Sequence, residues 1–181
     1  MDTINLILLL LCSYSSIYYI YSYIELTLSN DIGTCYAGGV VGNNGSSSTL
    51  KACYAWGSVT GSKSSGTVYV GGVTGSNDLG TLTACYHAKG TVNGPAGTTG
   101  GVAGRNFKDS MFGGGIITAC YWGGNGQEQG IGEDQVGTGE TTKVDGDWQN
   151  AVTQMNAALS GKGWQYELKD GSSLPTLKKE Q

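Results

Sequence analysis

Two short motifs recur along the chain in a fixed order, and this repetition constrains the fold more than any other feature of the sequence. One motif ends in Cys-Tyr, and the other reads Gly-Gly-Val-x-Gly. The Cys-Tyr motif occurs at 34–37, 50–55, 82–87 and 117–122. The Gly-Gly-Val-x-Gly motif occurs at 38–42, 71–75 and 100–104. Spacings of this kind are typical of repeat proteins, in which each unit buries its apolar positions against the next copy.

A full unit has the pattern of a coil of short β-strands. It runs from a Leu-x-Ala-Cys-Tyr strand to a Gly-x-Val strand, then through a variable Gly/Ser turn to Gly-Gly-Val-x-Gly and an Asn-containing turn. Stacked copies place equivalent residues ~4.8 Å apart, so inward positions need small side chains such as Ala, Cys, Val and Gly. The chain has 32 glycines in 181 residues and only 13% charged residues, which argues against a helical bundle. The sequence therefore predicts an all-β fold, a parallel β-solenoid (β-helix) of about four short Gly-rich coils over residues 31–126.

The start of the chain differs from the repeats, because residues 4–24 carry no charge and include a run of leucines. Such a length suits a membrane-spanning helix or a secretory signal, although the basic residues that precede a signal peptide are missing. The alternation of Tyr with Ile or Ser at 19–24 fits an additional strand region equally, and an artefactual start is a third alternative. We predict a hydrophobic signal or anchor-like segment over residues 1–30, with membrane attachment through residues 4–24 as one consequence, and leave the other two alternatives open.

After the last repeat the composition changes twice. Residues 127–146 are polar and rich in glycine, which predicts a linker. Residues 147–181 predict a helix and a β-hairpin that together cap the end of the solenoid. The helix has an apolar stripe at helical spacing, with Asp147 and Gly161 as its capping residues. The stripe consists of Trp148, Ala151, Val152, Met155, Ala158 and Leu159. The hairpin has an alternating strand with Trp164, Tyr166 and Leu168, a turn at Asp170-Gly171 and a return strand at 174–177.

The repeated residues resemble the GLUG-motif repeat family of bacterial surface and adhesin-like proteins of the Bacteroidales type. Copies in that family read as an Asn/Ala-Cys-Tyr-Ala strand, a Gly-x-Val strand and a Gly-Gly-Leu/Val-Val-Gly strand, and residues 33–126 carry the resemblance. The segments 137–142 and 163–177 look like the closing segment that follows such repeats. The resemblance implies an extracellular or outer-surface location, with the protein secreted or membrane-anchored.

The repeated cysteines have three conceivable roles, which are packing, disulfide formation and metal binding. Because they occupy the same place in successive copies, stacking predicts a ladder of reduced, buried side chains at Cys35, Cys53, Cys85 and Cys120. A bridge between adjacent rungs is the alternative, since ~4.8 Å lies within the Cα separations that disulfides allow. The sequence has no Cys-x-x-Cys pair and a single histidine, His87, so no metal site is predicted.

Catalytic and nucleic-acid-binding patterns are missing from the sequence. Residues 33–126 contain two acidic residues, Asp78 and Asp109, and both fall in predicted turns, so neither a catalytic pair nor a cofactor is predicted. The net charge is −4 and the chain has one arginine, which argues against nucleic acid as a partner.

Aromatic side chains recur beside the cysteines and leave two functions open. They are Trp56, Trp122, Tyr54, Tyr86 and Tyr121, with Tyr36 at the corresponding place in the first copy. Rings packed into a buried ladder indicate a structural spacer or a fragment of a larger repeat protein, whereas an exposed strip indicates contact with a ligand. We predict a non-enzymatic cell-surface adhesion or binding module that presents these rings to a glycan or protein. The spacer is the alternative, and a polysaccharide-cleaving β-helix is a distant third.

Overall fold

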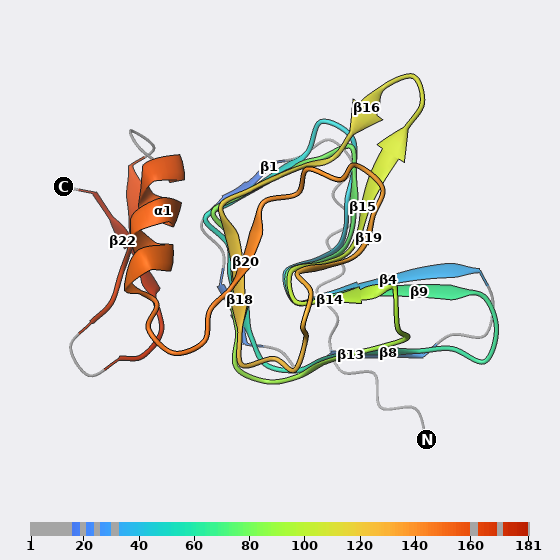
Figure 1. Ribbon diagram of the computed structural model, residues 1–181, viewed down its shortest axis with the longest axis horizontal. Helices are drawn as coiled ribbons and strands as arrows, with labels where there is room; N and C mark the ends of the chain where they lie inside the picture. The colour runs from blue at the N-terminus through green and yellow to red at the C-terminus, as the bar shows by residue number, and fades with distance from the viewer. Residues whose placement is uncertain are drawn as a thin grey trace.

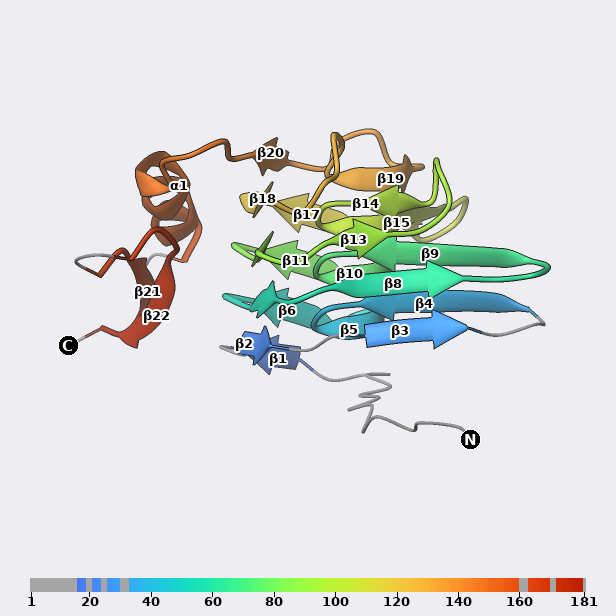
Figure 2. The same cartoon turned by 90° about the horizontal axis from the view of Figure 1, so that it is seen from below.

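The chain winds into a parallel β-solenoid, seen along its axis in Figure 1 and from the side in Figure 2. The computed structural model describes residues 16–18, 21–23, 26–29, 33–159, 163–169 and 172–180. Within these residues, three complete turns of five strands each are followed by a partial turn. The solenoid predicted from the repeats is therefore confirmed.

Each turn repeats the same order of short strands. The first turn contains β1 (Ser16–Tyr18), β2 (Tyr21–Tyr23), β3 (Leu26–Ser29), β4 (Thr34–Gly38) and β5 (Val41–Asn44). The second contains β6 (Thr49–Lys51), β7 (Tyr54–Trp56), β8 (Val59–Ser62), β9 (Thr67–Gly71) and β10 (Thr74–Asp78). The third contains β11 (Thr81–Thr83), β12 (Tyr86–Ala88), β13 (Val92–Asn93), β14 (Thr99–Gly100) and β15 (Ala103–Asp109). The last strands are β16 (Gly113–Gly114), β17 (Ile116–Thr118), β18 (Cys120–Gly123), β19 (Ile131–Asp134) and β20 (Thr141–Lys143).

Equivalent strands of successive turns pair in parallel and build five sheets that run along the axis. We number them in chain order as sheet 1 (β1-β6-β11-β17), sheet 2 (β2-β7-β12-β18-β20), sheet 3 (β3-β8-β13), sheet 4 (β4-β9-β14) and sheet 5 (β5-β10-β15-β19). The pairing keeps the sequence repeats in register, since Tyr54, Tyr86 and Tyr121 lie opposite one another in sheet 2. Equivalent residues of the last three Cys-Tyr motifs therefore stack in one column.

The interior is filled by apolar side chains at repeated positions. Leu50, Leu82 and Ile117 stack in register on the inner face of sheet 1. Sheets 3 and 4 form a narrower arm beside this wider body (Figure 1), and the space between them is filled mainly by valine. The side chains in the arm are Ala37, Val59, Val68, Val70 and Val92. Small and medium side chains fit here because each must pack against its own copy one rung away.

Residues at the start of the chain contribute strands to the first turn. Tyr21 in β2 lies opposite Tyr54 in β7, and β3 pairs in parallel with β8. Of the three alternatives for residues 1–30, the additional strand region is therefore correct for β1, β2 and β3. A helix through the whole of 4–24 is wrong, because β1 and β2 lie within it. The remainder of the predicted signal or anchor segment, residues 1–15, lies outside the described residues.

The polar segment 127–146 also contributes to the solenoid. Its strand β19 pairs in parallel with β15, and β20 pairs in parallel with β18. The prediction of a linker is therefore wrong for these two strands. Ile131 is the residue of β19 that packs in the core, and the other strand positions are polar. Strands of this composition lack the apolar alternation by which strands are recognised in a sequence.

The C-terminal residues form the predicted helix and hairpin, called here the C-terminal unit. The unit contains α1 (Gln149–Leu159), β21 (Trp164–Glu167) and β22 (Thr176–Lys179). The carboxylate of Asp147 caps α1, because its Oδ1 accepts a hydrogen bond of 2.9 Å from the backbone N–H of Gln149. Gly161 and the Asp170-Gly171 turn lie outside the described residues. In the part of the chain that the structure describes, no helix has the length and apolar character needed to cross a membrane.

The C-terminal unit packs along the side of the solenoid, against sheet 2 (Figures 1 and 2). Two tyrosine hydroxyls join the unit to the solenoid, since Tyr166 donates to the carbonyl of Ala84 at 2.9 Å and Tyr86 donates to that of Pro175. The apolar interface combines Ala52, Tyr54, Ala84, Tyr86, Ala88 and Tyr121 with Trp148, Ala151, Val152, Met155, Leu159, Tyr166 and Leu174. The helical stripe is buried as predicted, but its predicted position at the end of the solenoid is wrong. It covers the outward Ala and Tyr residues of three successive turns and so braces them together.

A left-handed alanine forms the corner between sheets 1 and 2. Ala52, Ala84 and Ala119 have φ values of +51°, +51° and +50°. This conformation costs an L-residue about 1–2 kcal/mol, which glycine would avoid. The methyl groups of Ala52 and Ala84 are completely buried in the interface with the C-terminal unit. Burial of these methyl groups offsets the strain and gives a reason for alanine at the repeated corner.

Candidate binding surfaces

Sheet 2 carries the tyrosines that the sequence predicted as contact residues, and it buries them. Tyr54, Tyr86 and Tyr121 are 5%, 0% and 7% exposed. The rings of Tyr54 and Tyr86 are stacked with centroids 5.0 Å apart, and the ring of Trp148 lies 5.0 Å from that of Tyr86. Burial raises the pKa of the Tyr86 hydroxyl, which therefore stays protonated as a hydrogen-bond donor. These three rings form a ladder beneath the C-terminal unit.

The two predicted tryptophans of sheet 2 lie on opposite faces. Trp122 pairs in register with His87 and points into the core, where it is 5% exposed. Trp56 is half-buried on the outer face, and its Nε1 donates to the hydroxyl of Tyr86 at 3.2 Å. The ammonium group of Lys89 lies 4.8 Å from the Trp56 ring centroid. Of the two alternatives for these rings, the structure therefore shows the packed ladder and gives no exposed strip, and their contact with a ligand stays a prediction.

Three of the four repeated cysteines stack as predicted. The register of sheet 2 brings Cys53, Cys85 and Cys120 into successive rungs, and all three are buried free thiols. Each thiol donates to the backbone carbonyl two residues earlier, at 3.3–3.4 Å. Burial raises the pKa of Cys85 well above that of an exposed thiol, so the group stays neutral. The stack fills space in the core and satisfies carbonyls beside the left-handed alanines.

Cys35 does not belong to this stack, so the predicted four-residue ladder is wrong at this position. Cys35 lies in sheet 4, opposite Val68, and Tyr36 lies opposite Tyr69. The distance to the next Gly-Gly-Val motif would have revealed this alignment, because Cys35 and Val68 each precede it by three residues. The Cys-Tyr pair of the first copy is thus a coincidence of composition within a different strand of the coil.

A ladder of amide side chains runs through the inner face of sheet 5. The Nδ2 of Asn44 donates to Asn77 at 2.7 Å, Asn77 to Asn106 at 3.0 Å, and Asn106 to the carboxylate of Asp134 at 3.2 Å. Every donor points toward the C-terminal turn, and Asp134 ends the series because an ionised carboxylate only accepts. The Asn-containing turn predicted after each Gly-Gly-Val-x-Gly motif is therefore wrong for these residues, because Asn44 ends β5 and Asn77 lies within β10. Asn44, Asn77 and Asn106 each follow the last glycine of a Gly-Gly-Val-x-Gly motif by two positions, a signal that the sequence contained.

His87 is a buried packing residue of sheet 2. Its Nε2 donates to the carbonyl of Gly57 at 2.9 Å, and its Nδ1 accepts from the amide of Asn125 at 3.0 Å, which fits a neutral ring. Burial lowers the pKa of His87 from 6.5 to about 4, although the bond to Gly57 acts in the opposite direction. The side chain is completely inaccessible to solvent. These contacts give His87 a structural role.

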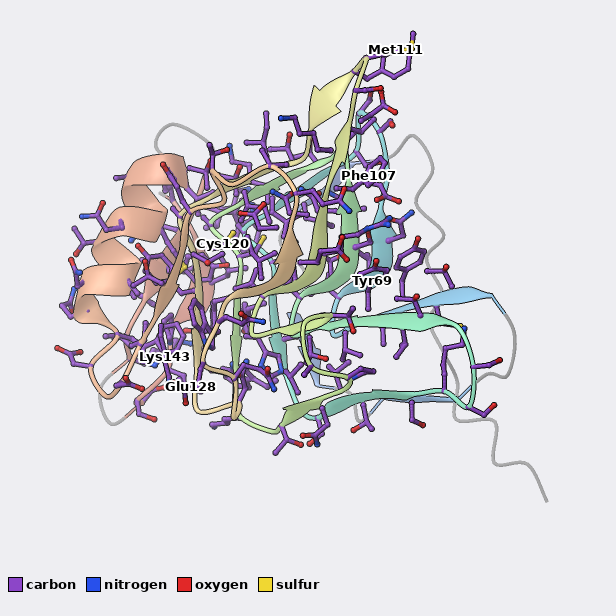
Figure 3. All side chains as sticks on the ribbon, turned by 45° about the vertical axis from the view of Figure 1, so that its right-hand side comes forward. Tyr69, Phe107, Met111, Cys120, Glu128 and Lys143 are labelled. Atoms are coloured by element: carbon purple, nitrogen blue, oxygen red, sulfur yellow. The ribbon has the colours of Figure 1, made fainter. Side chains whose placement is uncertain are left out.

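The outer angle between sheets 4 and 5 collects the aromatic and charged side chains that the solenoid does not bury in its core. We call this cluster the outer corner, and Figure 3 labels two of its members, Tyr69 and Phe107. The outer corner consists of Tyr36, Asn43, Tyr69, Ser76, Asp78, Arg105, Phe107 and Glu133. The two sheets meet closely because glycines line the angle, and a Cβ at Gly75 would lie only 2.5 Å from the backbone nitrogen of Ala37.

Arg105 occupies the centre of the outer corner. Its guanidinium carbon lies 4.8 Å from the ring centroid of Tyr69 and 4.8 Å from that of Phe107. Its Nη2 donates to Asp78 Oδ1 at 2.6 Å, and its Nε donates to Ser76 Oγ at 3.1 Å. The predicted turn position of Asp78 is therefore wrong, because this residue ends β10 and pairs with an arginine side chain that is 13% exposed. Burial opposes the charge of Arg105, but Asp78, Tyr36 and Tyr69 together outweigh it and keep the pKa raised.

The acidic side of the outer corner is also ordered by hydrogen bonds. Gln135 and Tyr69 both donate to the Glu133 carboxylate, at 2.6 and 2.8 Å, and these bonds lower its pKa. Asp78, Arg105 and Glu133 together carry one net negative charge. The column Asn43-Ser76-Arg105-Glu133 runs across successive turns. At its lower end, Asn43 Oδ1 is an acceptor shielded from solvent that has no hydrogen-bond partner among the described residues.

A second surface feature is the hairpin of β15 and β16. Met111, Phe112 and Ile116 are 82%, 76% and 57% exposed. Figure 3 shows Met111 at the outermost point of the hairpin, away from the body of the solenoid. Asp109, predicted in a turn, lies at the end of β15 and orders the turn that follows. Apart from Tyr36, the residues of the outer corner and of this hairpin were not predicted as contact residues from the sequence.

Neither a family model, nor a curated protein, nor a solved structure matches the chain. The resemblance to GLUG-motif repeats stays a prediction from the sequence. Within the described residues, no three His, Cys, Asp or Glu side chains are grouped as metal ligands would be. The candidate binding surfaces of the described residues are the outer corner and the hairpin of β15 and β16.

Proposed function

We propose that the protein is a non-enzymatic binding module of the outer cell surface or extracellular space, and that its outer corner contacts a neutral glycan. The observation that supports this proposal most strongly is the partly exposed Asn43 side chain beside the hydrogen-bonded Arg105 guanidinium and its aromatic neighbours. Both lie on one column of sheet 5, next to the tyrosines of sheet 4. The corner thus combines polar groups of fixed direction with aromatic rings.

A sugar ring matches this combination chemically. Its hydroxyls both donate and accept, so they pair with planar amide, guanidinium and carboxylate groups. Its C–H faces pack on aromatic rings, which supply large contact area at small entropic cost. The single net negative charge of the corner disfavours anionic sugars. A neutral glycan therefore suits the corner better than a phosphate, sulfate or uronic acid ligand.

The structural spacer remains a second candidate function. The observation in its favour is the burial of the tyrosines of sheet 2. Buried rings are what the sequence predicts for a spacer, whereas a binding module would expose them. The amide ladder of sheet 5 and the C-terminal unit both join successive turns, so the stack is rigid. A rigid stack of uniform turns would hold other domains at a fixed distance. The spacer and the binding module differ in whether the outer corner has a ligand.

A glycan array with the purified protein tests the proposal. We expect Tyr36→Ala and Asn43→Ala each to weaken binding of a neutral glycan by about tenfold, which corresponds to about 1.4 kcal/mol. Both side chains are partly exposed, so their removal should leave the fold intact. Trp56→Phe is the matched control, since it changes a predicted contact residue on sheet 2 and should not alter binding. An array without any bound glycan, or binding lost through Trp56→Phe alone, would contradict the proposal, and the first result would favour the spacer.

A further inference from the structure

The hairpin of β15 and β16 extends beyond the solenoid and exposes apolar side chains at its end. β15 continues past its pairing with β10 and β19, and its last residues pair antiparallel with β16. Between the two strands, Met111 and Phe112 are 82% and 76% exposed. Their packing contributes little to the stability of the solenoid, so stability gives no reason for apolar residues here.

The turn that presents these side chains is ordered. Oδ1 of Asp109 accepts hydrogen bonds from the backbone N–H groups of Met111, at 2.7 Å, and Phe112, at 3.0 Å. Gly113 follows with φ of +89°, a conformation in which glycine is unstrained. A preformed turn loses little conformational entropy when its side chains are buried by a partner. The hairpin tip, residues 109–113, therefore presents Met111 and Phe112 in a fixed conformation, which lowers the entropic cost of burying them against a partner.

The area of the tip restricts what it can bind. Met111 and Phe112 are 82% and 76% exposed, so together they expose roughly 300 Å², at about 200 Å² for each large side chain. Even when both partners are counted, burial of this area falls short of the about 1,200–2,000 Å² of a stable protein–protein interface. A lipid bilayer surrounds a narrow protrusion on all sides and needs no complementary shape. The small convex tip therefore suits a lipid surface better than a folded protein partner.

We propose that the hairpin tip inserts Met111 and Phe112 into the interfacial region of a lipid bilayer. Lys108 is exposed on β15 and can extend its ammonium group toward lipid phosphates. The carboxylate of Asp109 accepts hydrogen bonds from the backbone of the turn, so it stays at the base of the tip and does not enter the bilayer with Met111 and Phe112. Because the whole chain carries a net charge of −4, a zwitterionic membrane is the preferred surface. This inference is independent of the glycan contact at the outer corner.

Flotation with phosphatidylcholine vesicles tests this proposal. We expect the full chain to float with the vesicles and the double variant Met111→Ser/Phe112→Ser to lose at least about tenfold in partition coefficient, because each apolar side chain contributes through its buried area. Phe112→Leu should retain binding, and thermal unfolding should be the same for all three proteins. Added salt should weaken flotation only slightly, since Met111 and Phe112 are apolar and only the contact of Lys108 is screened.

A photo-crosslinking residue in place of Phe112 identifies what the tip touches when vesicles and an extract of cell-surface proteins are supplied together. Adducts with lipid support the proposal. Flotation that is equal for the wild type and the double Ser variant would overturn it, as would no flotation at all. Adducts with a protein alone, without vesicle binding, would assign the tip to a protein pocket and likewise overturn the lipid assignment.

Discussion

Acidification from pH 6.5 to 4 should destabilise the solenoid through His87. Burial lowers the pKa of His87 to about 4, whereas the unfolded chain binds a proton at the ordinary value of 6.5. Between these values the unfolded state carries more protons than the folded state, so the free energy of unfolding falls as the pH falls. The difference of about 2.5 pKa units corresponds to about 3 kcal/mol at 1.36 kcal/mol per unit. This stability is fully present above pH 6.5 and is lost by about pH 4.

Urea unfolding of the wild type and of His87→Gln over this pH range measures the effect. The glutamine amide can still donate toward Gly57 but has no proton to gain. We expect the wild type to lose about 3 kcal/mol more than the variant between pH 6.5 and 4. The comparison cancels the contribution of Glu133, because its lowered pKa gives the same pH dependence in both proteins. Equal pH dependence in the two proteins, or an NMR titration of His87 near 6.5, would refute the reasoning.

Three further outcomes follow from the packing. Met155→Ala should lower the free energy of unfolding, measured with a chemical denaturant, by roughly 2–5 kcal/mol, because its side chain is completely buried between α1 and sheet 2. Thr153→Ala, on the exposed face of α1, should be nearly neutral. Asn77→Ala should cost about 2–4 kcal/mol, since Asn44 and Asn106 each lose a buried hydrogen bond, whereas exposed Asn93→Ala should cost little by the same assay. Under native conditions maleimide should label half-buried Cys35 before the three stacked cysteines, and mass spectrometry that found the same labelling rate for all four would contradict the assigned positions.

The repeats were sufficient to predict the stacked coils because equivalent residues must meet one rung apart. The Gly-Gly-Val motif occurs once in each turn and marks the transition from sheet 4 to sheet 5, so it sets the register of the whole chain. The C-terminal helix was equally predictable, because its apolar stripe has helical spacing. Its location on the side of the solenoid was not, since the outward Ala and Tyr of sheet 2 form an apolar face only after three turns have been stacked.

The errors have a common physical origin in strands whose residues are determined by neighbours in space. Cys35 was assigned to the cysteine stack from a two-residue likeness, although its distance from the Gly-Gly-Val motif places it in sheet 4. β19 and β20 are polar and pair because the preceding turn supplies their hydrogen-bond partners. The same limitation applies to the outer corner. Tyr36 and Arg105 are 69 positions apart in the sequence, and only the register of the turns places the guanidinium 5.4 Å from the Tyr36 ring.

The most direct measurement of the proposed function is an NMR titration of the side-chain Nε–Hε group of Arg105 with a neutral glycan identified on the array. The chain has one arginine, so this signal is unique and reports from the centre of the outer corner. We predict a saturable shift of the Arg105 signal that follows the same binding curve as the backbone signals of Tyr36 and Asn43. Glycan binding that shifts residues of sheet 2 or the C-terminal unit and leaves the Arg105 signal unmoved would contradict the assignment of the outer corner as the binding surface.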